Sequence, residues 1–146
     1  MNHPLKKNDY CFCCGASNPS GLHLDVLKDG STGVKTEFTA LRRYCGWSHY
    51  LHGGVISLIF DELLGWLAFH LGYDALTARL EVRYRQPVPL GSRLILKAAL
   101  EKEIRGLLDI RTTASLEDGS VIAVGKGRMM IIETRRLGPP HPVDAA

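Results

Sequence analysis

The chain has 146 residues and a formal net charge of +3, with 45% hydrophobic and 23% charged residues. This composition is ordinary for a soluble globular protein, and the length suits one compact domain with its own core. No cluster of lysine and arginine with interleaved aromatic residues occurs, which argues against nucleic-acid binding. The first ten residues are polar and lack the apolar core of a secretion signal, so we expect a cytoplasmic protein.

Three of the four cysteines lie close together near the N-terminus, and Cys11 and Cys14 have the spacing of a zinc knuckle. A closed zinc site needs four ligands, and the sequence contains no second pair of this kind. His3, His23 and Cys45 could contribute only if the fold gathered them. We therefore interpret this stretch as a turn and predict no metal ligands.

Alternating residues predict a strand from Leu22 to Leu27, which ends at the turn Lys28-Asp29-Gly30. The stretch from Val34 to Thr39 is predicted to be its hairpin partner. A loop from about Leu41 to Leu51 leads into a long apolar run from Gly54 to Leu71. This run predicts a helix that is apolar on every side and therefore buried.

After Gly72 the apolar residues recur at every second position, which predicts a series of antiparallel strands. We place these strands at about residues 77–85, 94–100, 107–116 and 121–132. Gly125 and Gly127 share one face of the last strand, which predicts close approach of a helix or another backbone. The element order predicts an α+β fold, in which a curved antiparallel sheet wraps around one long central helix.

Asp61 and Glu62 lie in the middle of the predicted helix, where two carboxylates and the early glycines argue against a membrane span. Burying an ionised carboxylate is costly unless it is paired, so we expect at least one of them to serve chemistry. Neighbouring helical residues point about 100° apart, so the two side chains face different surroundings. We expect Glu62 to pair with a basic residue or to face the rim of the sheet.

Several motifs occur in a fixed order along the chain. They are His52-Gly53-Gly54, Asp61 seven residues after Gly54, Thr77, Tyr84-Arg85-Gln86-Pro87-Val88-Pro89-Leu90-Gly91, and the leader Cys11-Phe12-Cys13-Cys14-Gly15 with Asn18-Pro19-Ser20-Gly21-Leu22. On these residues the chain resembles the hotdog-fold acyl-CoA thioesterases, in the branch of the phenylacetic-acid and hydroxybenzoyl-CoA thioesterases.

The resemblance implies a hotdog fold and hydrolysis of an acyl-CoA thioester, with coenzyme A as part of the substrate and no cofactor. It assigns Gly53 and Gly54 to binding the thioester oxygen, Asp61 to base or nucleophile, and Thr77 to holding the water. His52 would orient the loop. Unpaired N–H groups at a helix start can bind such an oxygen. On sequence alone, the two glycines could equally serve a tight turn.

Helix geometry adds a prediction about assembly. Gly54 and Asp61 are separated by roughly 10 Å of helix rise, whereas a reaction centre requires about 3 Å to each group. Both groups can act on one thioester only if they come from two chains whose helices run antiparallel across a two-fold axis. We therefore predict an obligate homodimer, with pairing of dimers into homotetramers as a further expectation.

We expect residues 1–136 to form a single hotdog domain, with residues 1–21 as an arm and cysteine-containing loop, and residues 137–146 to be a disordered tail. Acyl-CoA is the expected small-molecule partner; nucleic acid and membrane are not expected. Three alternatives stay open: a non-catalytic acyl-CoA-binding hotdog protein, an enoyl-CoA hydratase, and a zinc-stabilised partner-binding module built on Cys11 and Cys14.

Overall fold

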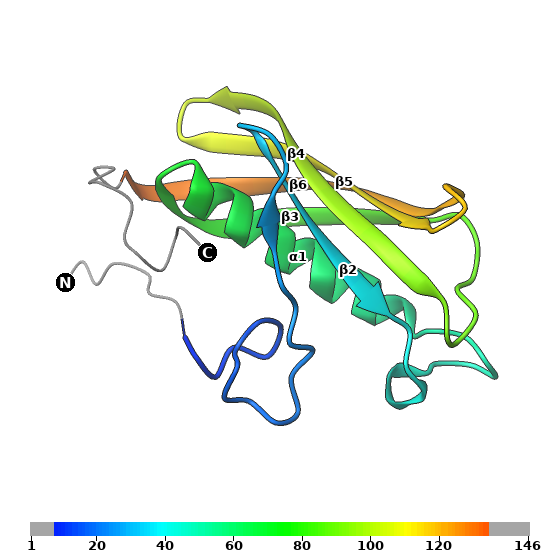
Figure 1. Ribbon diagram of the computed structural model, residues 1–146. Helices are drawn as coiled ribbons and strands as arrows, with labels where there is room; N and C mark the ends of the chain where they lie inside the picture. Colours follow the sequence, from blue (N-terminus) through cyan, green and yellow to red (C-terminus); the bar gives the residue numbers. More distant parts are fainter. Residues whose placement is uncertain (1–7, 135–146) are drawn as a thin grey trace.

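The computed structural model describes residues 8–134, which form one α-helix packed against a six-stranded antiparallel sheet (Figure 1). The elements in chain order are β1 (Leu27–Lys28), β2 (Gly33–Thr39), the 3-10 turn η1 (Arg42–Tyr44), α1 (Gly53–His70), β3 (Tyr73–Tyr84), β4 (Arg93–Ile104), β5 (Leu107–Leu116) and β6 (Val121–Thr134). The sheet order is β1-β2-β4-β5-β6-β3, which places β3 at one edge. The predicted α+β architecture is confirmed. The predicted tail and the first seven residues lie outside the described residues.

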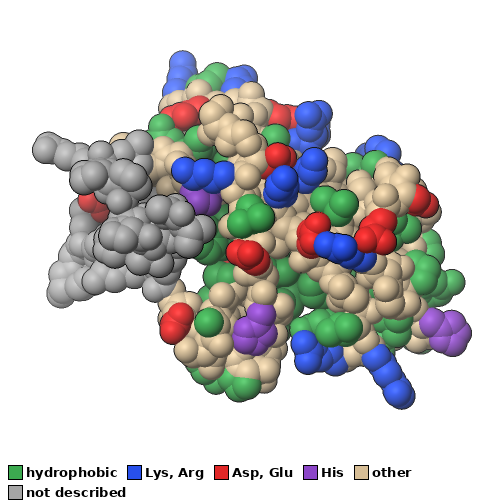
Figure 2. Space-filling view, in the orientation of Figure 1, with side chains coloured by type: hydrophobic (Ala, Val, Ile, Leu, Met, Phe, Trp, Pro, Cys, Tyr) green, Lys and Arg blue, Asp and Glu red, His purple; other side chains and the backbone are tan. Residues whose placement is uncertain are grey.

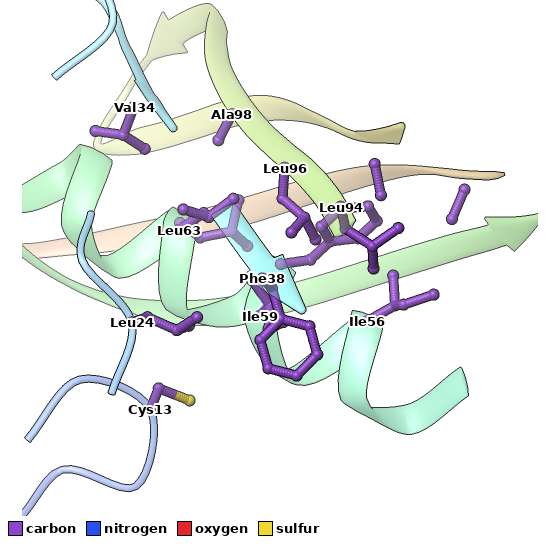
Figure 3. Packing of buried hydrophobic residues seen from close by; sticks show 14 of the residues in the cluster. Cys13, Leu24, Val34, Phe38, Ile56, Ile59, Leu63, Leu94, Leu96 and Ala98 are labelled. Carbon is purple, nitrogen blue, oxygen red and sulfur yellow. The ribbon is translucent and has the colours of Figure 1, made fainter. Parts of the chain in front are cut away.

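The core lies between α1 and the concave face of the sheet. Helical residues at spacings of three and four turn one face inward, and Figure 3 shows Ile56, Ile59 and Leu63 pointing toward Leu94 and Leu96 of β4. The buried helix residues are Ile56, Ile59, Phe60, Leu63, Leu64, Leu67 and Ala68. Burial of this apolar surface is the main favourable contribution to folding.

Two glycines of β6 allow the helix to lie close to the sheet. A Cβ on Gly127 would lie 2.4 Å from Leu64 Cδ1, and one on Gly125 would lie 3.1 Å from Phe60 Cδ2 and 2.3 Å from Thr112 Oγ1. Leu64 and Phe60 are fully buried, so neither has free space into which it could move. The prediction of close approach at these glycines is confirmed.

The predicted strand from Leu22 to Leu27 is wrong except at its last residue, which belongs to β1. Only Leu27 and Lys28 pair with β2; residues 22–26 form no strand, and His23 among them has a positive φ of 52°. The alternation in this segment has another cause: the N–H groups of Leu22 and Leu24 donate to the carbonyls of Phe12 and Cys13 in the N-terminal loop. Both leucine side chains are buried, so the segment ties that loop to the core.

β3 and β4 each extend four residues past a predicted end, and β6 extends two residues past its own. β3 begins at Tyr73, four residues before the predicted start, and β4 continues to Ile104. The extra residues of β4 pair with the first residues of β5. Strand ends of this kind depend on partners elsewhere in the chain, which apolar alternation does not reveal.

α1 is long and apolar enough to cross a membrane by length and composition alone. The fold uses it as the central helix of the core, where seven of its side chains are buried against the sheet. Core helices of soluble proteins satisfy the same criterion. The hydropathy of this helix is therefore explained by its packing.

Charged side chains of both signs are interspersed on the face shown in Figure 2. Across the neighbouring strands β5 and β6, Arg128 binds Asp109 through two hydrogen bonds of 2.7 and 3.1 Å, and this lowers the pKa of the Asp109 carboxyl. Such exposed ion pairs are screened by water and salt. The fold therefore rests on the core between helix and sheet.

Candidate active site

The start of α1 is capped by His52. Its backbone is extended, and its ring Nδ1 accepts a hydrogen bond of 2.9 Å from the N–H of Gly54. An accepting Nδ1 requires the neutral imidazole with its proton on Nε2. The Gly53 N–H forms no hydrogen bond with any other residue between 8 and 134. The two glycines had the same expected role, but the structure distinguishes them. The Gly53 N–H is available to a ligand, whereas the Gly54 N–H is already bonded to His52.

The loop before the helix is held by backbone hydrogen bonds. The N–H of His52 donates to the Tyr44 carbonyl and that of Leu51 donates to the Val88 carbonyl, each at 2.9 Å. A Cβ on Gly46 would lie 3.1 Å from the His52 Cα, so the loop also packs closely against His52. These contacts fix the position of the cap.

Tyr84, at the end of β3, supports the same helix start from the sheet. Its hydroxyl donates to the Gly53 carbonyl at 2.8 Å and lies 2.6 Å from Ser57 Oγ, which is left to donate to Tyr84. A pocket of about 310 Å³ lies here, lined by Gly53, Tyr84 and Arg85 among others. Sequence reasoning placed Tyr84 in a motif but gave it no role, and the only available signal was a tyrosine at the end of an alternating strand.

Asp61 is exposed in the single chain, and the prediction that it is buried in an all-apolar helix is wrong. Only one face of α1 packs on the sheet. Gly54, Leu58, Asp61 and Gly65 recur at helical spacing on another face, where Leu58 is half-buried and the other three are exposed. The Asp61 carboxylate accepts a hydrogen bond of 2.7 Å from Thr77 Oγ1 on β3. The structure therefore brings together Asp61 and Thr77, which lie 16 positions apart.

A β-bulge positions Thr77. In the pairing of β3 with β6, Thr77 lies opposite Met129 and Arg79 lies opposite Arg128, so Ala78 is an extra residue. Bulges bend a strand and redirect neighbouring side chains, and they are frequent beside active sites. Here the bulge lies where the Thr77 hydroxyl contacts Asp61.

Gly53 and Asp61 are separated by eight helical residues, or about 12 Å along the axis. One thioester carbonyl cannot contact both groups within a single chain, because hydrogen bonds to a reacting group span about 3 Å. The helix start and the Asp61–Thr77 pair are therefore two separate parts of the candidate site in one chain.

Glu62 faces a different side of α1. It accepts a hydrogen bond of 3.0 Å from Trp66 Nε1 and lies 3.8 Å from Cys11 Sγ, so its partners differ from the expected basic residue. It shares a pocket with residues 73–75 of the edge strand β3, which agrees with the expected rim position. Burial, with the Glu62 carboxylate nearby, raises the pKa of the Cys13 thiol to about 12. Burial and the same carboxylate also raise the pKa of Cys14.

This arrangement predicts an order of thiol reactivity. The thiolate is the reactive form, and Cys13 combines a raised pKa with an exposed fraction of 4%, whereas Cys45 is exposed. We expect iodoacetamide at pH 7.5 to label Cys45 about ten times faster than Cys13 or more, because labelling depends on the thiolate fraction and on access to the sulfur. Peptide mass spectrometry over time measures both rates. In denaturant the labelling rates of Cys45 and Cys13 should become similar. Equal labelling rates in the native protein would contradict the burial of Cys13.

Comparison with known proteins points to one family. The family model described as the thioesterase superfamily matches residues 49–123. The chain is 37% identical over 57 residues to the acyl-coenzyme A thioesterase THEM4 of Rattus norvegicus, a match that covers 39% of this chain and 24% of that protein. The chain thus spans about a quarter of the length of this curated relative.

Solved structures share the fold. A hypothetical thioesterase from Streptococcus pneumoniae, determined with coenzyme A, has a TM-score of 0.73 at 17% identity, covering 77% of this chain and 88% of that one. The E. coli PaaI protein from the phenylacetic acid degradation operon has a TM-score of 0.73 at 14% identity, covering 78% and 83%. At these identities the likeness speaks for the fold alone, and it confirms the predicted hotdog architecture.

Proposed function

The chain belongs to the thioesterase superfamily, and we propose that it hydrolyses acyl-CoA thioesters to the free acid and the coenzyme A thiol. The observation that carries the proposal is the pair of Asp61 and Thr77, joined at 2.7 Å on an exposed face of the central helix. A carboxylate held by a hydroxyl on an accessible surface can bind and activate a water molecule.

In the proposed reaction Asp61 acts on the carbonyl carbon, as a base through water or by direct attack. In the base route, Asp61 takes a proton from water, and the oxygen of that water bonds to the carbonyl carbon. The carbonyl oxygen gains negative charge, which a preorganised N–H donor stabilises. The tetrahedral intermediate formed in this way then breaks its carbon–sulfur bond, and the departing coenzyme A thiolate takes the proton from Asp61. Thr77 holds the carboxylate, and through it the water.

We assign the donor to the Gly53 N–H, at the positive end of the α1 dipole. Gly54 lies beside it, but its own N–H binds His52 Nδ1. His52 and Gly54 thus act by fixing the first turn of α1. Tyr84 also holds Gly53, because its hydroxyl donates to the Gly53 carbonyl. Both glycines were expected to bind the thioester oxygen. In the proposed site only the Gly53 N–H does so, and His52, Gly54 and Tyr84 hold it in place.

The proposed catalytic unit is a homodimer joined along β3. This strand lies at the sheet edge, is 12 residues long and carries Leu76, which is 49% exposed. A long unpaired strand edge is a template for pairing with another chain. Pairing of β3 with its copy would join two sheets into one and place the two central helices side by side.

The exposed helix face supports the same arrangement. Gly54 and Asp61 lie on one stripe of α1, and the midpoint between them falls near Ser57 and Leu58. A two-fold axis at this midpoint brings the helix start of one chain beside Asp61 of the other. Gly65 continues the stripe, and a Cβ there would meet nothing within 4 Å in the single chain. Each composite site then takes Gly53 from one chain and Asp61 with Thr77 from its partner.

Two variant structures of the Streptococcus pneumoniae thioesterase support the choice of residues. One variant replaces an aspartate by alanine, and the other replaces a threonine 16 positions later by alanine. Asp61 and Thr77 have the same separation and are in contact here. We propose that this pair forms the reacting side of the site.

We further propose that hydrolysis uses protein groups alone, with coenzyme A present only as part of the substrate and no separate cofactor. A cytoplasmic location fits the four free cysteines, because thiols stay reduced in that compartment.

A panel of acyl-CoAs tests the proposal. The panel should include acetyl-, phenylacetyl-, 4-hydroxybenzoyl- and longer-chain acyl-CoAs, with product acid and free coenzyme A separated by liquid chromatography. For the best substrate we expect a kcat/KM of about 10⁴ M⁻¹s⁻¹ or more, within the usual range of enzymes. Calorimetry on the same panel separates the alternative: tight acyl-CoA binding with no free coenzyme A would identify a non-catalytic binding protein and overturn the hydrolase.

A further inference from the structure

Three acidic or thiol side chains converge between the N-terminal loop and α1. The ligand atoms of Cys11, Cys14 and Glu62 all lie within 4.8 Å of one another, and each residue is half-buried. Cys11 Sγ lies 3.8 and 3.9 Å from the two carboxylate oxygens of Glu62, which is 51 positions away in the sequence. The fold thus supplies a third ligand, a carboxylate, beside the two thiols of the Cys-x-x-Cys pair.

These separations fit a tetrahedral zinc site. With zinc–sulfur and zinc–oxygen bonds of about 2.3 and 2.1 Å, sulfur and oxygen ligands around one ion lie about 3.6 Å apart and two sulfurs lie about 3.8 Å apart. The distances of 3.8 and 3.9 Å from Cys11 to Glu62 are within a few tenths of an ångström of this edge length, and all three ligand atoms lie within 4.8 Å of one another. Small side-chain rotations would therefore bring the three ligand atoms into binding geometry.

The backbone holds the two thiols in a tight turn that depends on Gly15. The Gly15 N–H donates to the Cys11 carbonyl at 2.9 Å. A Cβ on Gly15 would lie 2.3 Å from Cys11 N and 2.4 Å from Asp9 O, so a larger residue cannot occupy this position. The sequence Cys-x-x-Cys-Gly thus forms a compact turn with both thiols at the Glu62 side of the loop.

The carboxylate is oriented by its own helix. Trp66, one turn after Glu62, donates its indole N–H to Glu62 Oε1 at 3.0 Å. Partners of this kind fix metal-binding carboxylates in their productive orientation. A pocket of about 260 Å³ lies at the cluster, lined by the three ligand residues, Gly65 and Trp66 among others, which gives room for a water molecule as fourth ligand.

We propose that Cys11, Cys14 and Glu62 bind a zinc ion, which fastens the N-terminal loop to the central helix. Two sulfur ligands favour zinc over magnesium or calcium. On binding, each thiol forms a zinc–sulfur bond and releases its proton to solvent, while the carboxylate binds as it stands. The ion takes no part in hydrolysis, so the inference is independent of the proposed function.

Zinc binding to the purified full chain tests the inference. Protein stripped with chelator under reducing conditions is titrated with zinc ions alone, and bound metal is counted by mass spectrometry after desalting. We expect one zinc per chain and a rise in Tm of about 5 °C or more at saturating zinc. Cobalt in place of zinc should give the absorption of a tetrahedral site with thiolate ligands.

Variants locate the site. Cys11→Ser, Cys14→Ser and the nearly isosteric Glu62→Gln should each weaken zinc binding by about tenfold or more, whereas Cys45→Ser, an exposed cysteine outside the cluster, should bind as the parent does. Trp47, 91% exposed, can be replaced by phenylalanine so that the fluorescence of Trp66 reports zinc beside Glu62.

Several outcomes would overturn the inference. One is failure of the parent chain to retain zinc after desalting; another is equal zinc binding by the Cys11→Ser/Cys14→Ser double variant. Recovery of the stripped protein with a Cys11–Cys14 disulfide that persists under reducing conditions would also overturn it. Because the parent titration needs no substitution, the test stands even if a variant fails to fold. Release of the coenzyme A thiol from acyl-CoA is measured separately with the zinc-free chain. That assay tests the proposed hydrolysis, so either proposal can fail without the other.

Discussion

Replacement of Asp61 by asparagine is expected to lower kcat for acyl-CoA hydrolysis by about 10²–10⁴-fold, the contribution of a positioned proton-transfer group. Asparagine keeps the size of the side chain and an oxygen that can accept from Thr77, but it cannot take a proton from water. Asp61 is exposed, so Tm should stay within about 2 °C of the parent value. Steady-state kinetics and a thermal melt measure both quantities.

Glu81→Gln is the matched control for this variant. Glu81 is also an exposed acid, and it lies on β3 four residues beyond Thr77, where it pairs with Arg79. Its amide should leave kcat unchanged. Parent-like turnover in the Asp61→Asn protein would remove Asp61 from the reaction and with it the proposed mechanism.

Replacement of Gly53 by proline should lower kcat by about 10²–10³-fold, as expected when one donor to the developing negative charge is lost. Proline has no N–H, so the substitution removes the proposed donor itself. The position suits it otherwise: Gly53 is the first helical residue, where proline is favoured. The preceding residue, His52, is already extended, as residues before proline prefer.

Gly53→Ala separates the lost donor from the added bulk. Both substitutions place a Cβ at 3.3 Å from the Tyr84 ring, but alanine keeps the N–H. We expect the alanine variant to retain most of the parent kcat and the proline variant to lose it, with similar melting temperatures. Equal losses would show that the site is sensitive to bulk at Gly53 and would reject its N–H as the donor.

Mixing the two inactive chains gives a direct test of composite sites. In a dimer of one Gly53→Pro chain and one Asp61→Asn chain, one of the two sites combines an intact Gly53 with an intact Asp61. Random mixing at equal amounts makes half of the dimers mixed, so about one quarter of parent activity should return. Activity no greater than that of the separate variants would mean that the groups do not act across chains.

The architecture could be predicted because its signals are local. The apolar run that became α1 and the alternation in β5 and β6 follow from periodicity, and Gly125 and Gly127 marked the close helix contact. The segment from Leu22 to Val26 had the same alternation without becoming a strand. Its hydrogen bonds go to the N-terminal loop, a contact that periodicity cannot reveal.

The surroundings of the two central carboxylates could not be predicted. Composition made α1 look buried on all sides, but the sheet covers one face only, and the face bearing Asp61 is exposed in the single chain. Glu62 meets Cys11 and Trp66 because the N-terminal loop folds back over the helix. Such long-range contacts depend on the path of the whole chain. The choice of Asp61 and Thr77, in contrast, came from the family resemblance, through the offset of Asp61 from the two glycines and the place of Thr77 in the following strand.

The glycines of β6 have a consequence for substitutions at residues outside the candidate site. They set the depth at which α1 sits in the sheet, because Leu64 and Phe60 occupy the space that side chains at Gly127 and Gly125 would need. A methyl group at Gly127 would press on Leu64 and is expected to shift α1 on the sheet, and with it Asp61 relative to Thr77 on β3. The distance between Asp61 and Thr77 thus depends on two glycines of the neighbouring strand, which set how closely α1 packs on the sheet.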